Sequence, residues 1–154
     1  MAKIDAATTS EIVAEFGAKP EMLVQILAKI VERFGWIPED TIRQLATELN
    51  LSRADVHGVV EYYHDFRTRE PGKHIVRICQ AEACQAMGSQ ALTAYAEETL
   101  AMSLHDTENN ISLEPVYCLG NCACSPAVMV DGKTIGRVDE QRFNRIIDDL
   151  RGSD

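Results

Sequence analysis

Five cysteines are the residues of this sequence with the clearest potential for chemistry. Cys79 and Cys84 form a C-x4-C pair, and Cys118 and Cys122 form a C-x3-C pair some thirty residues further along the chain. A fifth, Cys124, follows two positions later. Four thiolates suit a tetrahedral zinc ion or an iron–sulfur cluster. The first question is therefore what these sulfurs hold, and which of the five is spare.

Each cysteine pair directly follows a segment that is predicted to be a β-strand. "HIVRIC" (74–79) leads to the first pair and "NNISLEPVYC" (109–118) leads to the second. Because strand ends on one edge of a sheet lie near each other, two loops could deliver four thiolates to one point. Gly120, midway in "CLGNC", allows a sharp bend, and such a loop can aim N–H groups at the sulfides of a cluster. A helix expected to start near Met87 would place its positive N-terminal end beside the site.

Composition and charge narrow the classes of protein. The 154 residues carry a formal net charge of −9 and no basic run, which disfavours binding to nucleic acid or to an anionic membrane surface. The first residues lack the apolar segment and cleavage site of a secretory signal, and no stretch approaches the ~18 apolar residues of a membrane span. We therefore expect a cytoplasmic protein, in which paired cysteines bind metal more often than they form disulfides.

The spacing alone leaves several chemistries open for the sulfurs. A [2Fe–2S] cluster is favoured, and structural zinc comes second because both spacings are close to those of zinc sites. A disulfide disagrees with the reducing compartment, and unliganded cysteines would behave as small apolar side chains. The pattern differs from the plant-type C-x4-C-x2-C arrangement.

The first half of the chain, residues 1–70, predicts a small helical bundle. The clearest helix runs from Pro20 to Gly35, with apolar residues at helical spacing and Gly35 as its C-terminal stop. A row of apolar residues along one face of a helix indicates a packed core rather than a cofactor site. The other helices are expected to begin after Ser10, at Pro38, and at Ser52, which forms a capping box with Asp55.

The second half, residues 71–154, predicts a small mixed sheet with helices against it. A helix, "QAMGSQALTAYAEETLA", separates the two strands, and Pro115 in the second strand favours an edge position or a bulge. Asp131-Gly132 fits the tight turn of a hairpin, and Asp139 can cap a last helix. The expected order is β-α-β-β-β-α, which makes the whole chain an α+β protein.

These features together resemble a known family. "FGWIPED" and "LNLSRADVHGVVEYYHDF", the C-x4-C pair, and "CLGNC" with the later "PAVMV" are similar to the small thioredoxin-like [2Fe–2S] subunit of NADH dehydrogenases. The resemblance spans about residues 20–150. The family includes the peripheral subunit of respiratory complex I, that of NAD-reducing hydrogenases, and the gamma subunit of NAD-dependent molybdenum formate dehydrogenases. "AEACQAMG" and "EPVYCLGNCACSPAVMV" look most like that gamma subunit.

The resemblance implies a fold and a ligand set. Residues 1–70 would form a helical bundle domain, and residues 71–154 would form a thioredoxin-like [2Fe–2S] domain with a small mixed sheet. Four cysteines would bind one cluster, two at each iron: Cys79 with Cys84, and Cys118 with Cys122.

The resemblance also implies a function that this chain does not perform alone. It would be the electron-transfer subunit of an NAD-dependent formate dehydrogenase complex, and none of its residues would be catalytic. Its cluster would exchange electrons with the FMN of a partner subunit that binds NAD, while a larger molybdenum and iron–sulfur subunit would oxidise formate. The alternatives are the equivalent subunit of NADH:quinone oxidoreductase or of an NAD-reducing hydrogenase, or a zinc-stabilised interaction module without a redox role.

Cys124 is predicted to be the spare cysteine. Four thiolates complete two tetrahedral irons bridged by two sulfides, so a fifth has no vacancy. Pairing Cys124 with Cys118 would lengthen the loop to C-x5-C, and pairing it with Cys122 would give a cramped C-x-C. Ser125-Pro126 follows at once and is expected to lead the chain away from the site.

Overall fold

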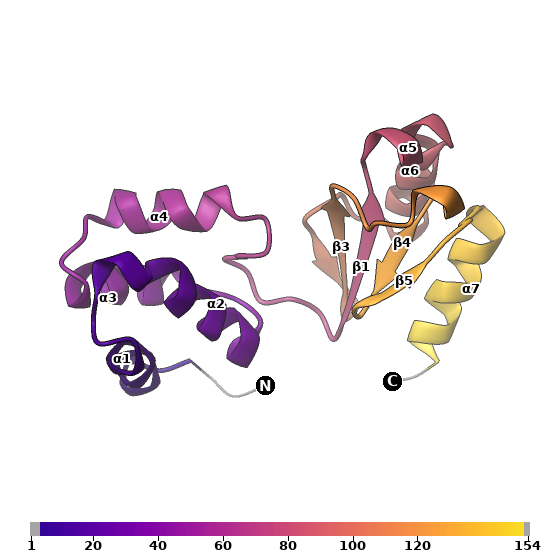
Figure 1. Cartoon of the computed structure of the whole chain (residues 1–154). Helices are drawn as coiled ribbons and strands as arrows, with labels where there is room; N and C mark the ends of the chain where they lie inside the picture. Colours follow the sequence, from indigo (N-terminus) through magenta and orange to yellow (C-terminus); the bar gives the residue numbers. More distant parts are fainter. Residues whose placement is uncertain (1–3, 153–154) are drawn as a thin grey trace. The chain divides into compact units, whose positions relative to one another are not determined.

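The computed structural model describes residues 4–152, which form two compact units with a boundary between Glu70 and Pro71 (Figure 1). Each unit has a hydrophobic core of its own. The described part of the first unit is helical, and the second unit contains a five-stranded sheet with helices. The α+β class predicted from the sequence is confirmed.

Helices of three to four turns form the described part of the first unit. Their buried faces meet in one core, which includes Ile26, Leu27 and Ile30 from one helix and Ile42 and Leu45 from another. The helical elements are α1 (Ala6–Glu15), the 3-10 turn η1 (Pro20–Met22), α2 (Leu23–Phe34), α3 (Glu39–Glu48) and α4 (Arg53–Tyr62).

Local capping sets the limits of these helices. Gly35 adopts a left-handed conformation (φ +84°) and ends α2 as predicted. Ser52 and Asp55 form the predicted capping box of α4, each side chain bonding to the backbone of the other residue. α1 begins earlier than the sequence predicted, because the Asp5 carboxylate accepts a hydrogen bond from the Thr8 N–H at 2.8 Å and caps the helix.

The second unit is built on the sheet order β2-β3-β1-β4-β5. β1 runs parallel to β3 and antiparallel to β4, and the other neighbouring pairs are antiparallel, so the sheet is mixed as predicted. The strands are β1 (His74–Cys79), β2 (Thr107–Glu108), β3 (Ile111–Val116), β4 (Val128–Val130) and β5 (Lys133–Ile135). The helical elements are α5 (Glu82–Ala86), α6 (Ser89–Leu100), the 3-10 turn η2 (Cys122–Cys124) and α7 (Glu140–Arg151).

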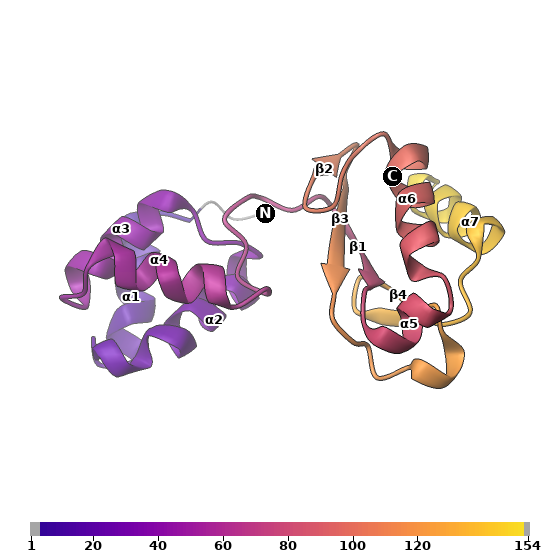
Figure 2. The same ribbon diagram turned by 90° about the horizontal axis from the view of Figure 1, so that it is seen from above.

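α6 and α7 pack against the same face of this sheet (Figure 2). Val76 and Ile78 of β1 point into the core that these helices close, together with Phe143 of α7. Asn144 of α7 donates a hydrogen bond of 2.6 Å to the hydroxyl of Tyr95 in α6 and ties the two helices together. The face is therefore sealed without contributions from the cysteines.

The predicted turns and caps of this unit are confirmed, and one strand was missed. Asp131 and Gly132 both have positive φ in the β4–β5 hairpin, and the Asp139 carboxylate caps α7. β2 has two residues and was not predicted. β3 lies between β2 and β1, but β2 pairs only with Ile111 and Ser112 at its start. β2 therefore makes no ladder bonds with β3 at Pro115, which explains how a proline fits in a strand that is not at the edge of the sheet.

Candidate functional site

The cysteine pairs meet because β1 and β3 are parallel and end at the same edge of the sheet. Cys79, the last residue of β1, lies opposite Val116, the last residue of β3. The Cys79 N–H donates to the carbonyl of Ala127 at 3.0 Å, which ties the end of β1 to the chain entering β4. Cys118 follows Val116 by two residues. The sequence prediction that the two strands leading to the cysteine pairs end at one edge of the sheet is confirmed.

The first pair is held by regular structure. Cys79 and Cys84 are each 2% exposed and form a small apolar cluster with Ala127. Cys84 lies within the single-turn helix α5, whereas the sequence predicted a loop there and a helix starting near Met87. The long helix α6 begins only after Gly88, whose positive φ (+94°) turns the chain between the two helices.

The second pair lies in a loop whose backbone bends unusually. Cys118 has φ +102°, a conformation that side-chain-bearing residues rarely adopt, and Gly120 has φ +68°. The Gly120 N–H points back to Cys118 Sγ at 3.4 Å, so the loop aims a donor at this sulfur. Cys122 begins η2, and the thiols of Cys118 and Cys122 are both exposed.

The pKa of the Cys122 thiol responds to cysteines of both pairs. Cys118, through its charge and through a hydrogen bond, is the main cause that raises the pKa of the Cys122 thiol above its ordinary value. The pKa of this thiol is raised further, by smaller amounts, by partial desolvation and by Cys84 and Cys79. Because charge interactions weaken with distance, this agrees with strands β1 and β3 ending at one edge of the sheet.

The arrangement fits a centre that takes two thiolates at each of two irons. Two segments contribute two cysteines each, one pair buried and one at the surface. Within residues 4–152, no three or more His, Cys, Asp or Glu side chains form a group that could hold a single metal ion. A [2Fe–2S] cluster does not require such a group, because each iron takes only two ligands from the protein.

Cys124 faces a different part of the structure. In a 3-10 turn, residues two apart lie on different sides, so Cys122 and Cys124 point in different directions. A Cβ placed on Gly136, just after β5, would lie 2.5 Å from the Cβ of Cys124 and 2.6 Å from Asn121 Nδ2. Cys124 therefore packs closely against Gly136.

Ser125 is a residue of the site that the sequence interpretation missed as a functional group. Its hydroxyl lies 3.3 Å from Cys84 Sγ and also donates to the carbonyl of Cys122 at 2.9 Å. A single side chain thus links the two cysteine segments. The sequence gives only a slight signal for this role, a hydroxyl residue three positions after Cys122. Only the fold brings Ser125 to Cys84.

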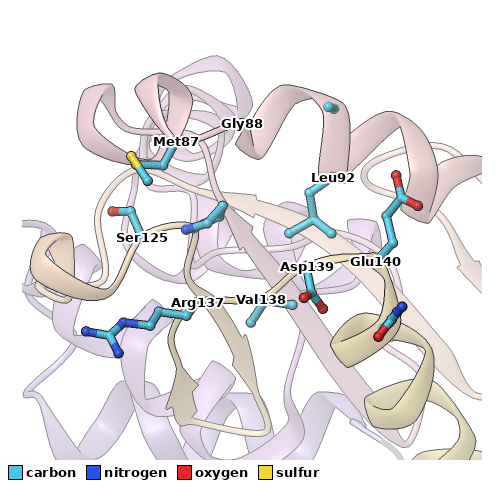
Figure 3. A pocket seen from close by; sticks show the side chains of 11 residues that line it. Met87, Gly88, Leu92, Ser125, Arg137, Val138, Asp139 and Glu140 are labelled. Atoms are coloured by element: carbon cyan, nitrogen blue, oxygen red, sulfur yellow. The ribbon is translucent and has the colours of Figure 1, made fainter.

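An open pocket of about 570 Å³ lies beside these segments (Figure 3). Met87, Ser125 and Arg137 lie on one side of it, with Leu92 and Asp139 on the other. Met87 is among the most exposed large apolar residues of the described chain.

No helix among the described residues is long and apolar enough to cross a membrane.

Comparisons with known proteins agree with this geometry. A protein of Pseudomonas aeruginosa that is named as a subunit of NADH-quinone oxidoreductase is 31% identical over 117 residues, which cover 75% of this chain and 70% of that protein. The NADP-reducing hydrogenase subunit HndA of Solidesulfovibrio fructosivorans is 29% identical over 127 residues, which cover 81% of this chain and 74% of that protein.

A solved structure shares the fold. The crystal structure of an NAD+-reducing [NiFe]-hydrogenase in the air-oxidized state gives a TM-score of 0.69 at 17% identity, covering 89% of this chain and 24% of that chain. The family described as thioredoxin-like [2Fe-2S] ferredoxin matches residues 9–151, nearly the whole length. The chain therefore belongs to the thioredoxin-like [2Fe-2S] ferredoxin family, whose cofactor, a [2Fe–2S] cluster, is the one that the cysteines predicted.

Proposed function

We propose that this protein is the electron-transfer subunit of an NAD-dependent formate dehydrogenase complex, and that Cys79, Cys84, Cys118 and Cys122 bind its [2Fe–2S] cluster. The observation that supports the ligand assignment is that the parallel strands β1 and β3, which lead into the two cysteine pairs, end at one edge of the sheet. All five cysteines lie in the second unit, so residues 71–154 are the proposed cluster domain.

When bound, the cluster takes up and returns single electrons. The residues of this chain determine how well it does so. Cys79 and Cys84 hold their side in an apolar setting from which water is excluded, and the Gly120 N–H supplies a hydrogen bond to Cys118. Cys118 and Cys122 keep the other side at the surface, where a redox partner can approach.

Analysis of the purified protein tests the cofactor and the ligands. We expect a reddish-brown protein with about two irons and two sulfides per chain and, after reduction, the EPR signal of a spin-half cluster. A colourless protein with one zinc per chain would instead support the zinc-stabilised interaction module, and the proposal would fail.

The proposed partners are a flavoprotein subunit that binds FMN and NAD and a larger molybdenum and iron–sulfur subunit. Two relatives are named as subunits of an NADH-quinone oxidoreductase and of a hydrogenase, which supports membership of a multi-subunit complex. The choice of formate dehydrogenase rests on the local resemblance of "AEACQAMG" and "EPVYCLGNCACSPAVMV" to its gamma subunit. The equivalent subunit of NADH:quinone oxidoreductase or of an NAD-reducing hydrogenase is the alternative that these relatives favour.

Co-purification from the native host separates these assignments. A tagged chain should elute with a flavin-containing subunit and a molybdenum-containing subunit, and formate should reduce the cluster in that complex. Recovery with quinone-reducing or nickel-containing subunits would assign it to one of the alternatives. We propose a cytoplasmic location for the complex, and cell fractionation tests it.

A further inference from the structure

The Ser125 hydroxyl touches both cysteine segments at once. The residue is 8% exposed, and it follows η2 directly. Its oxygen lies 3.3 Å from the sulfur of Cys84, which is 2% exposed, and 2.9 Å from the Cys122 carbonyl. Figure 3 shows the same side chain at the edge of the pocket, on the side of Met87.

The direction of the contact between Ser125 and Cys84 depends on the state of the sulfur. A thiol and a hydroxyl can each act as donor or acceptor. In the thiol form the Cys84 S–H can donate to the Ser125 oxygen, while the single proton of the Ser125 hydroxyl goes to the Cys122 carbonyl. A cysteine that binds iron does so as a thiolate, which can only accept. With a thiolate, the contact is favourable only if the Ser125 hydroxyl donates its proton to the sulfur. The hydroxyl can donate to the sulfur alone, or share its proton between the sulfur and the Cys122 carbonyl.

We propose that Ser125 is a positioning residue that donates a hydrogen bond to the Cys84 thiolate and thereby raises the reduction potential of the cluster. The inference rests on the proposed ligand set. Reduction adds one negative charge, so a donor aimed at a ligand sulfur stabilises the reduced form more than the oxidised form. The effect is strengthened here because Cys84 and Ser125 are both buried, where a hydrogen bond is screened less than in water.

The sharpest test compares Ser125→Ala with Ser125→Thr and with a matched control. Ser125→Ala removes the hydroxyl and little volume, whereas Ser125→Thr keeps the hydroxyl. Ser112→Ala is the control, because Ser112 is also a buried serine of the second unit, 2% exposed. The Ser112 hydroxyl accepts from the Gly72 N–H at 2.8 Å and lies near the start of β1, opposite Ile75. Ser112→Ala therefore measures the effect of losing a buried hydroxyl at the end of the sheet that lies away from Cys79.

The midpoint potential, followed by EPR, is the main readout. We expect Ser125→Ala to keep its iron and to have a lower potential than the wild type, while Ser125→Thr and Ser112→Ala stay near the wild-type value. Equal potentials in the wild type and Ser125→Ala, each with a full cluster, would overturn the inference. An equal drop in Ser112→Ala would do the same, since it would show a general structural effect.

Vibrational spectra give a second readout, in which the wild type is compared with Ser125→Ala or, if that variant loses its cluster, with Ser125→Gly. The comparison is needed because the Gly120 N–H at Cys118 Sγ also exchanges in D2O in every one of these proteins. A hydroxyl donor to a cysteine sulfur makes the iron–sulfur stretching bands sensitive to exchange of H2O for D2O. We expect a deuterium shift in the resonance Raman bands of the wild type, and a smaller one wherever the hydroxyl is absent. Bands that do not respond to D2O in the wild type would overturn the inference while the proposed function stands. A wild type without iron would instead defeat the proposed function.

Discussion

The two cysteine pairs of the second unit reach the same place by different means. Cys79 ends a strand and Cys84 lies in a helix, and both are almost completely buried. Cys118 and Cys122 lie in and after a loop, and both are exposed. Regular secondary structure therefore holds the first pair, whereas the backbone conformation of a few loop residues holds the second.

This difference predicts unequal tolerance to change. The buried pair cannot move without disturbing the apolar cluster around Ala127 and the hydrogen bonds at the end of β1. The exposed pair depends on the positive φ of Cys118, a conformation that costs about 1–3 kcal/mol and persists only where its surroundings enforce it. We expect the buried pair to act as a preformed half-site and the loop to be the adaptable half.

The largest effect should come from removing a buried sulfur. In Cys84→Ser the shorter, poorer ligand sits in a helix that cannot move toward the metal, so we expect loss of nearly all iron, visible colour and EPR signal. In Cys122→Ser we expect loss of most of the cluster or a weakly bound one with an altered spectrum, because the exposed loop can adjust. Iron and sulfide analysis after identical anaerobic purification makes the comparison.

Circular dichroism supplies the control for both variants, since the core closed by α6 and α7 does not include these sulfurs. A Cys84→Ser protein that keeps more iron than Cys122→Ser would reverse the proposed order of rigidity.

The next largest effect should come from Gly136, which lies against η2. A methyl group there would come within 2.5 Å of the Cys124 Cβ and 2.7 Å of its carbonyl oxygen, so Gly136→Ala must displace the turn that carries Cys122. Such overpacking costs about 1–3 kcal/mol. We expect faster loss of iron to a chelator together with a lower free energy of unfolding, the first read from absorbance and the second from urea denaturation.

Gly132→Ala is the matched control for this variant. Gly132 has φ +82° and open space around it, so alanine costs about 1–2 kcal/mol of backbone strain in the β4–β5 hairpin. We expect a similar loss of stability with chelation kinetics close to those of the wild type. Equal acceleration of iron loss in both variants would show that η2 is not the sensitive element.

A smaller effect is expected at Gly120, within the loop itself. Its φ is +68° and a Cβ there would meet nothing within 4 Å, so Gly120→Ala adds strain without a clash, about 1–2 kcal/mol. Gly120→Asn should be milder, because asparagine tolerates the left-handed conformation. We expect the rate of cluster release to rank Ala above Asn above wild type. Identical rates in the three proteins would contradict the claim that backbone conformation holds the second pair.

What the sequence could predict was local. The capping box of Ser52 and Asp55, the Asp131-Gly132 turn and the Asp139 cap each depend on residues a few positions apart, and all three are present. The meeting of the cysteine pairs was also predictable, since it requires only that two strands end at one edge.

What the sequence could not predict depends on contacts made by the fold. α5 is too short to show a helical period, and β2 exists only through its pairing with the start of β3. Ser125 becomes part of the site because the turn after Cys122 is carried to α5, a contact across forty-one positions. No spacing rule within one segment encodes such a contact.

The smallest effect is expected at the fifth cysteine. Cys124 lies on a different side of the 3-10 turn from Cys122, and its Cβ packs against Gly136. These observations support the sequence prediction that Cys124 is spare, and a direct substitution tests it.

Cys124→Ser gives that test, because serine is close to cysteine in shape and keeps the contact with Gly136. We expect iron content, colour and EPR signal equal to those of the wild type, and a free energy of unfolding changed by less than about 1 kcal/mol. Cys122→Ser, measured beside it, should lose most of its iron. If iron is instead lost from Cys124→Ser and normal in Cys122→Ser, then Cys124 is the ligand, and the 3-10 turn must rotate when the cluster binds.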